Sequence, residues 1–141
     1  MLILPPIIYG VTFSTADYPG TVSIGQATLA ALVRDVCAAI IAQGFTNICL
    51  SNHHLAPGHF RTLLQVKQDI EFAHGAVVAV PNMGEPEFSG EPPREFVEGA
   101  IHAGSFETSL VLQARPELVH LDRARQLKPV WKSIVEQRKA G

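Results

Sequence analysis

Three of the six histidines in this 141-residue sequence lie within seven positions, in a short polar segment that follows an apolar run. They are His53, His54 and His59. Neutral imidazole binds zinc and other first-row divalent metals and also exchanges protons near pH 7, so the cluster could serve a metal centre or acid–base catalysis. Because His53 and His54 are adjacent, we expect at most one of them to face a given site. Exposed or structurally hydrogen-bonded histidines are the alternative.

A second segment with catalytic potential is His-Ala-Gly-Ser-Phe-Glu-Thr-Ser, residues 102–109. An imidazole and a carboxylate near one turn, here His102 and Glu107, can act together as acid and base, or as metal ligand and supporting partner. The alternative is an ordinary helix start, in which Ser105 and Thr108 act as caps and Glu107 suits the helix dipole. The spacing by itself favours neither.

Hydrophobic periodicity, together with the glycines and prolines that interrupt it, predicts the elements that must position these residues. Predicted strands cover residues 2–9, 45–50 and 76–80. Predicted helices cover residues 26–43, 59–74, 94–99, 106–114 and 129–140, with loops over 10–25, 51–58 and 82–93.

The alternation of strands and helices predicts an α/β fold, a three-layer open sheet that is mostly parallel with helices on both faces. We expect one domain over residues 1–141. In such sheets ligands bind beyond the carboxyl ends of the strands, so the loops over residues 10–25 and 51–58 are the expected place for a site.

Composition excludes several function classes. The net charge is −2, 47% of the residues are hydrophobic and only 17% are charged. This balance offers no broad attraction to nucleic acid or to an anionic membrane, and no apolar run reaches the length of a membrane span. The first six residues lack the basic start of a signal peptide, so we expect a soluble cytoplasmic protein. A chain with so few charged residues is also expected to have part of its surface covered by another subunit, so we expect a homo-oligomer.

Several segments together resemble the creatininase (creatinine amidohydrolase) family, in which similar motifs occur in the same order. The His-Ala-Gly-x-x-Glu-Thr-Ser segment is the most specific of them. The resemblance runs from about Pro6 to Val119, through Tyr9-Gly10, Tyr18–Ser23, Phe45–His54, Ile101–Leu110 and Arg115–Val119.

This resemblance implies an oligomeric, metal-dependent hydrolase of small amides that cleaves a non-peptide C–N bond with a pair of Zn or Mn ions. On the matching positions, His54 is the implied metal ligand and His102 the implied acid–base catalyst. Glu107 is implied to support the site or to bind metal. We take Asn52 and His59 as candidate substrate-binding residues.

The sequence also departs from the family pattern. Where the family has ligands in its first loop, residues 11–17 and Val22 offer Ser, Thr and Val, which do not replace carboxylate or imidazole ligands, and only Asp17 carries a carboxylate. Ala56 stands where the family has a glutamate. We therefore expect a divergent and shortened member with no intact two-metal centre, and at most one Zn or Mn bound by His54, with Asp17 or His102 as a further ligand.

Two functions stay open at this point. One is a divergent creatininase-like amidohydrolase with a small-molecule substrate. The other is a non-hydrolytic family member that serves as a binding or assembly subunit, because most metal ligands of the family are absent. A third reading is an unrelated α/β domain with chance motif matches.

Overall fold

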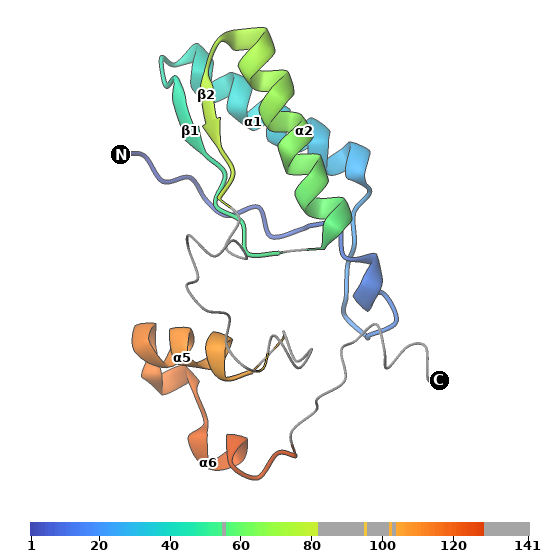
Figure 1. The fold of residues 1–141 in the computed structure, drawn as a ribbon, viewed down its shortest axis with the longest axis vertical. Helices are drawn as coiled ribbons and strands as arrows, with labels where there is room; N and C mark the ends of the chain where they lie inside the picture. Colours follow the sequence, from blue (N-terminus) through green and yellow to red (C-terminus); the bar gives the residue numbers. More distant parts are fainter. Residues whose placement is uncertain (55, 82–94, 96–101, 103, 129–141) are drawn as a thin grey trace. The chain divides into compact units, whose positions relative to one another are not determined.

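The computed structural model describes residues 1–54, 56–81, 95, 102 and 104–128 (Figure 1). It divides into two compact units, residues 1–88 and 89–141, and each is considered by itself. The loop expected over residues 82–93 lies almost wholly outside the described residues, and so does the helix expected over 129–140. Of the helix expected over 94–99, only Glu95 is described, and it is helical.

The first unit is built around a parallel βαβ arrangement. Its two strands pair in parallel, with Ile48 opposite Val78, and an α-helix connects them. The elements are the 3₁₀-helix η1 (Phe13–Thr15), α1 (Gln26–Ala42), β1 (Asn47–Cys49), α2 (Pro57–His74) and β2 (Val77–Ala79). These helices and strands confirm the helices predicted over residues 26–43 and 59–74 and the strands predicted over 45–50 and 76–80, and with them the α/β class.

The ends of the two long helices follow from their residue types. Pro57 occupies the first turn of α2, where its missing N–H costs no intrahelical bond. Gly75 ends α2 in the left-handed conformation, with φ of +63°, and Gly44 follows α1 with φ of +93°. Glycine adopts these angles without steric penalty, so both helices end where the sequence predicts.

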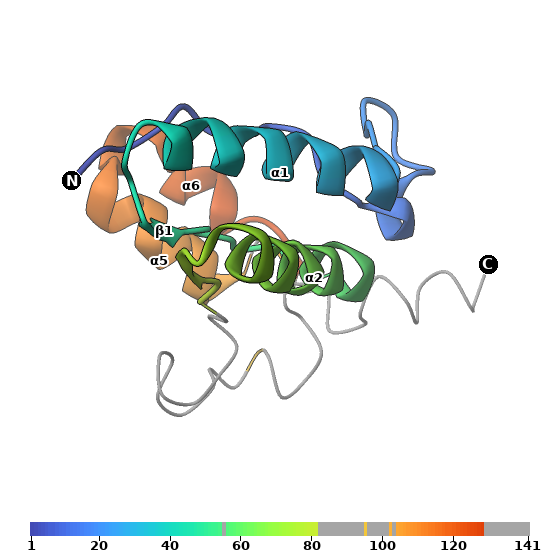
Figure 2. The same ribbon diagram turned by 90° about the horizontal axis from the view of Figure 1, so that it is seen from above.

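The core of the first unit lies where α1 and α2 run alongside each other and α2 packs against β2 (Figures 1 and 2). The buried positions on each helix recur at intervals of three or four residues, as expected for an amphipathic helix. The buried apolar residues are Val11, Leu29, Ala30, Val33, Cys37, Leu63, Val66, Ile70, Ala76 and Val78.

Only one face of the two-stranded sheet is covered within the described residues of this unit. Side chains alternate along each strand, so Ile48 and Val78 face the core. Their neighbours Cys49 and Val77 point to the other face, where Val77 is 62% exposed. A three-layer sheet with helices on both faces is therefore not confirmed.

The prediction of a buried strand over residues 2–9 is wrong. These residues form no strand, and the side chains of Ile3 and Ile8 are each 79% exposed. An apolar run becomes a strand only where its backbone finds a partner, and Pro5 and Pro6 have no N–H to donate. The first backbone pairing along the chain is an isolated parallel bridge between Gly10 and Ser23.

Two side chains of α2 close the outer edge of β2. The N–H and carbonyl of Val78 point away from β1; Glu71 Oε1 accepts the N–H at 3.0 Å, and Lys67 Nζ donates to the carbonyl at 2.7 Å. Lys67 also pairs with Glu71. The Lys67 hydrogen bond, followed by that from Val78, lowers the pKa of the Glu71 carboxyl. With its outward N–H and carbonyl used by these side chains of α2, Val78 offers no backbone partner to a further strand.

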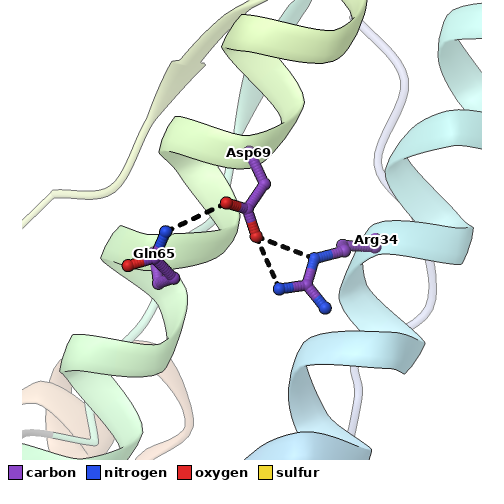
Figure 3. A network of polar contacts seen from close by, with 3 residues as sticks. All are labelled: Arg34, Gln65 and Asp69. Atoms are coloured by element: carbon purple, nitrogen blue, oxygen red, sulfur yellow. Dashed lines mark hydrogen bonds and ion pairs between the residues drawn. The ribbon is translucent and has the colours of Figure 1, made fainter.

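An ion pair joins α1 to α2 on the solvent side (Figure 3). Arg34 donates to Asp69 Oδ2 from Nε at 2.9 Å and from Nη2 at 2.5 Å, and Gln65 Nε2 donates to Asp69 Oδ1 at 2.9 Å. Hydrogen bonds from Gln65 and then from Arg34 lower the pKa of the Asp69 carboxyl.

The second unit is helical over its described residues. It contains α5 (Ser105–Ala114), the 3₁₀-helix η2 (Pro116–Leu118) and α6 (Leu121–Ala124). The prediction of a helix over 106–114 that ends before Pro116 is confirmed. Across the described part of the chain, no helix combines the length and the apolar character that crossing a membrane requires.

Leu29→Ala tests the core. Leu29 is 2% exposed, so the truncation is expected to lower the free energy of unfolding by about 2–5 kcal/mol. The matched control is Leu32→Ala on the same helix, where the side chain is 41% exposed. Urea unfolding measures the free energy of unfolding of both variants. Equal losses would contradict the placement of Leu29 in the core.

Asp69→Asn tests the ion pair through its pH dependence. Because the pKa of Asp69 is lowered on folding, its contribution is present above about pH 4, the ordinary value for an aspartate, and is lost as pH falls through the folded value. The wild type should therefore have the higher urea midpoint at pH 7, and the difference should shrink at pH 3. Asp35→Asn on α1 is the control; an unchanged difference at pH 3 would contradict the assignment.

Candidate functional site

The polar segment after β1 is shaped by the side chain of Asn52. Its Nδ2 donates to the carbonyl of His54 at 3.0 Å, and its Oδ1 accepts the N–H of His54 at 3.2 Å. An asparagine commonly forms such a turn with the backbone two residues on. The turn fixes the main chain of His54 at the carboxyl end of β1, while His53 is exposed. The two adjacent histidines therefore lie in different surroundings, His53 at the surface and His54 against Val11.

The side chains of His54 and His59 both hydrogen-bond to the backbone of one residue, Val11. The N–H of Val11 donates to His59 Nδ1 at 3.2 Å, and His54 Nε2 lies 2.9 Å from the carbonyl oxygen of Val11. The two imidazole rings stand edge to face, with centroids 5.0 Å apart and an interplanar angle of 76°. His54 comes from the loop after β1 and His59 from the first turn of α2, so the contact joins three segments.

Burial sets the protonation of His59. Its side chain is 8% exposed, and Val11 beside it is 3% exposed. Burial, with a smaller effect from neighbouring His54, lowers the pKa of His59. The neutral ring that this favours is also the one that can accept the Val11 N–H, because a protonated Nδ1 has no lone pair to offer.

The loop that follows Val11 is held from its other side by Ser23. Thr12 N–H donates to Ser23 Oγ at 2.9 Å, and Ile24 N–H donates to the carbonyl of Gly10 at 3.0 Å. Gly10 leaves the space for the His59 ring, since a Cβ built there would stand 3.0 Å from His59 Nδ1. The loop over residues 10–25 is thus anchored at its base.

The described residues do not assemble the metal centre that the family resemblance implies. Among them, no three histidine, cysteine, aspartate or glutamate side chains lie where they could bind one ion. His54 Nε2 and His59 Nδ1 are already engaged with Val11. Asp17, another expected ligand, is exposed in the loop after η1. We therefore assign no chemical step to a metal.

The two residues expected to be catalytic lie in the second unit. His102 is exposed, and Glu107 is exposed in the first turn of α5. The structure does not place them relative to His54 and His59, so the six predicted site residues are not assembled into one site here.

A residue that the sequence reasoning missed, Glu95, caps α5. Its two carboxylate oxygens accept the N–H groups of Ser105 and Phe106, each at 2.6 Å, and the Ser105 hydroxyl at 2.9 Å. The Phe106 hydrogen bond, followed by those from Ser105, lowers the pKa of Glu95. The reading in which Ser105 and Thr108 cap this helix is wrong, because no capping bond from a side chain at the helix start forms and Glu95 takes that place.

Ser23 and Val11 were also missed as parts of the histidine site. Val11 contributes through its backbone N–H and carbonyl, and such a contact cannot be inferred from the identity of its side chain. Ser23 is one of several serines and threonines in its loop, and only the fold shows which of them reaches Thr12. Gly10 was the one available signal, because a glycine before a buried segment often marks a close approach.

Comparisons with known proteins agree with the motifs. The family model of creatininase, described as creatinine amidohydrolase, matches residues 1–139. A curated relative, the creatinine amidohydrolase of Pseudomonas putida, is 28% identical in an alignment 142 positions long, which covers 86% of this chain. The alignment covers 53% of the relative, so the chain spans about half its length. No solved structure matches the chain.

This α/β chain belongs to the creatininase family, because the family model matches nearly all of it. The resemblance first seen in the motifs is confirmed.

Gly10→Ala tests the close approach of the His59 ring to the loop. The new methyl group would sit 3.0 Å from His59 Cε1 and Nδ1 within a buried contact, so stability should fall by about 1–3 kcal/mol. Gly25→Ala is the matched control, since its nearest neighbour would be 4.0 Å away. Thermal or urea unfolding measures both, and an unchanged Gly10→Ala variant would contradict the packing.

Proposed function

We propose that this chain is an amidohydrolase that cleaves a non-peptide C–N bond in a small amide. The observation that carries the proposal is the family match over residues 1–139, which includes the His-Ala-Gly-x-x-Glu-Thr-Ser segment. Because the chain spans about half the length of its curated relative, the activity is proposed and not transferred. Creatinine is the first substrate to test, since the relative is named for it.

Amide hydrolysis requires a base that activates water and an acid that protonates the leaving nitrogen. His102 is the proposed proton carrier, because an imidazole exchanges protons in the physiological range and this one is exposed to solvent. Glu107 is proposed to assist it, from the first turn of α5 two residues after the Glu95 cap at Ser105.

The loop at the carboxyl end of β1 is the proposed substrate-binding region. Ligands of α/β proteins bind beyond this edge of a sheet, and Asn52 and His59 lie there. His59 Nδ1 is used by Val11, so Nε2 is the ring nitrogen proposed to meet a substrate. Binding to a small molecule suits this region, whereas the homo-oligomer and the cytoplasmic location expected from the sequence stay predictions.

The variant His102→Ala tests the activity. Loss of a general acid–base group is expected to lower kcat for amide hydrolysis by about 10²–10⁴-fold, with a smaller effect on KM. Creatinine and a panel of small cyclic and formyl amides serve as substrates for the full chain, with Zn²⁺ or Mn²⁺ supplied and withheld. His120→Ala removes another exposed histidine of the same unit and should leave kcat unchanged.

If the wild-type chain hydrolyses none of these amides under any metal condition, the proposal fails. The non-hydrolytic binding subunit considered from the sequence would then be the better description. If both histidine variants lose activity equally, His102 has no special role.

A further inference from the structure

We propose that Glu95 is a positioning residue for His102 and Glu107, the two residues proposed to carry out amide hydrolysis. Its carboxylate holds the turn at Gly104–Phe106, which lies between them in the chain. The inference rests on the proposed function for what is positioned, whereas the contact itself is tested without turnover. Glu95 is not claimed to touch the substrate.

The carboxylate of Glu95 binds the start of α5 through both of its oxygens. Oε1 accepts the N–H of Phe106 at 2.6 Å, and Oε2 accepts the N–H of Ser105 at 2.6 Å and its hydroxyl at 2.9 Å. The first N–H groups of a helix have no intrahelical acceptor, and a negative charge beside them is favourable. Because two successive N–H groups bind two oxygens of one planar group, the contact also fixes the direction of the turn.

Gly104 gives a second, independent indication of this contact. A Cβ built on Gly104 would stand 2.9 Å from Glu95 Oε1 and nearer still to Oε2, so a side chain there would displace the carboxylate. The φ of Gly104 is −87°, a value open to any residue, so this angle does not require a glycine. The approach of Glu95 therefore accounts for the glycine of the His-Ala-Gly-x-x-Glu-Thr-Ser segment.

His102 and Glu107 flank this turn closely along the chain. His102 precedes Gly104 by two residues, and Glu107 follows Ser105 by two in the first turn of α5. A change in the direction of the turn would therefore move one of the two relative to the other. Acid–base groups need placement to within about 0.5 Å, and an error of about 1 Å lowers the rate on the order of 10²-fold. Glu95 thus acts on the reaction through the main chain.

Amide ¹H–¹⁵N spectra of the full chain test the contact. Short hydrogen bonds to a carboxylate move the donor protons downfield, so the Ser105 and Phe106 signals should lie downfield and move upfield in Glu95→Ala. Glu117→Gln is the matched control, because it neutralises another exposed carboxylate of the same unit, one that pairs with Arg115. Unmoved Ser105 and Phe106 signals in Glu95→Ala would overturn the proposal.

Steady-state kinetics separate positioning from a merely structural cap. Glu95→Ala should lower kcat for amide hydrolysis about 10²-fold and leave KM within about twofold. Glu117→Gln should keep the wild-type kcat. A cap that only stabilised α5 would lower the folded fraction, so activity and the helical circular dichroism signal would fall together. That result, or a folded Glu95→Ala variant with the wild-type kcat, would contradict the positioning role.

A double-mutant cycle with Gly104→Ala links the two observations. Gly104→Ala should lower kcat about as much as Glu95→Ala, because the new methyl group displaces the carboxylate. With the carboxylate already removed, this close contact is gone, so the double variant should be no slower than either single variant. Effects that multiply would give the two residues independent roles and overturn the proposal. Should Glu95→Ala fail to fold, Glu95→Gln, which keeps one oxygen acceptor and no charge, takes its place in the cycle.

The two proposals fail in different experiments. If the wild type hydrolyses none of the amides, the proposed function fails and the positioning role falls with it, although the amide spectra still report the cap. If the wild type is active and a folded Glu95→Ala variant is equally active, the positioning role alone fails.

Discussion

The fold of the first unit depends on how the buried peptide groups at Val11 are satisfied. Val11 leaves the amino-terminal segment and enters the core, where neither strand offers its N–H and carbonyl a backbone partner. His59 accepts the N–H and His54 donates to the carbonyl, and the two histidines come from two other segments. Once this contact forms, the loop after β1, the first turn of α2 and the base of the loop over residues 10–25 are fixed together.

At the edge of the sheet, too, side chains satisfy backbone groups that have no strand partner. On β2, Lys67 and Glu71 use the outward carbonyl and N–H of Val78, so that edge is closed to another strand. The apolar segment over residues 2–9 leads directly into Gly10 and Val11, which lie next to the loop that leaves β1. Its residues are exposed and form no strand.

Sequence periodicity was sufficient for the elements that bury a regular stripe. Leu63, Val66 and Ile70 recur at helical spacing on α2, and Pro57 and Gly75 mark its ends, so its bounds could be predicted closely. The prediction of a strand over residues 2–9 failed because apolar residues indicate only that a segment favours burial. They do not indicate whether another strand is available to hydrogen-bond with its backbone. The cap from Glu95 could not be predicted, since it reaches α5 from ten residues away and through no fixed spacing.

In the candidate site, the type of a residue does not by itself determine its role. The motif predicts a role for His54, and the structure gives its ring a defined partner, the carbonyl oxygen of Val11. What the ring does cannot be read from residue type, because its partner is a main-chain carbonyl whose position only the fold determines. The hydrogen bond ties the loop after β1 to Val11 through His54 Nε2. Nδ1 of the same ring keeps its lone pair, so the contact holds the loop in place without using the second ring nitrogen.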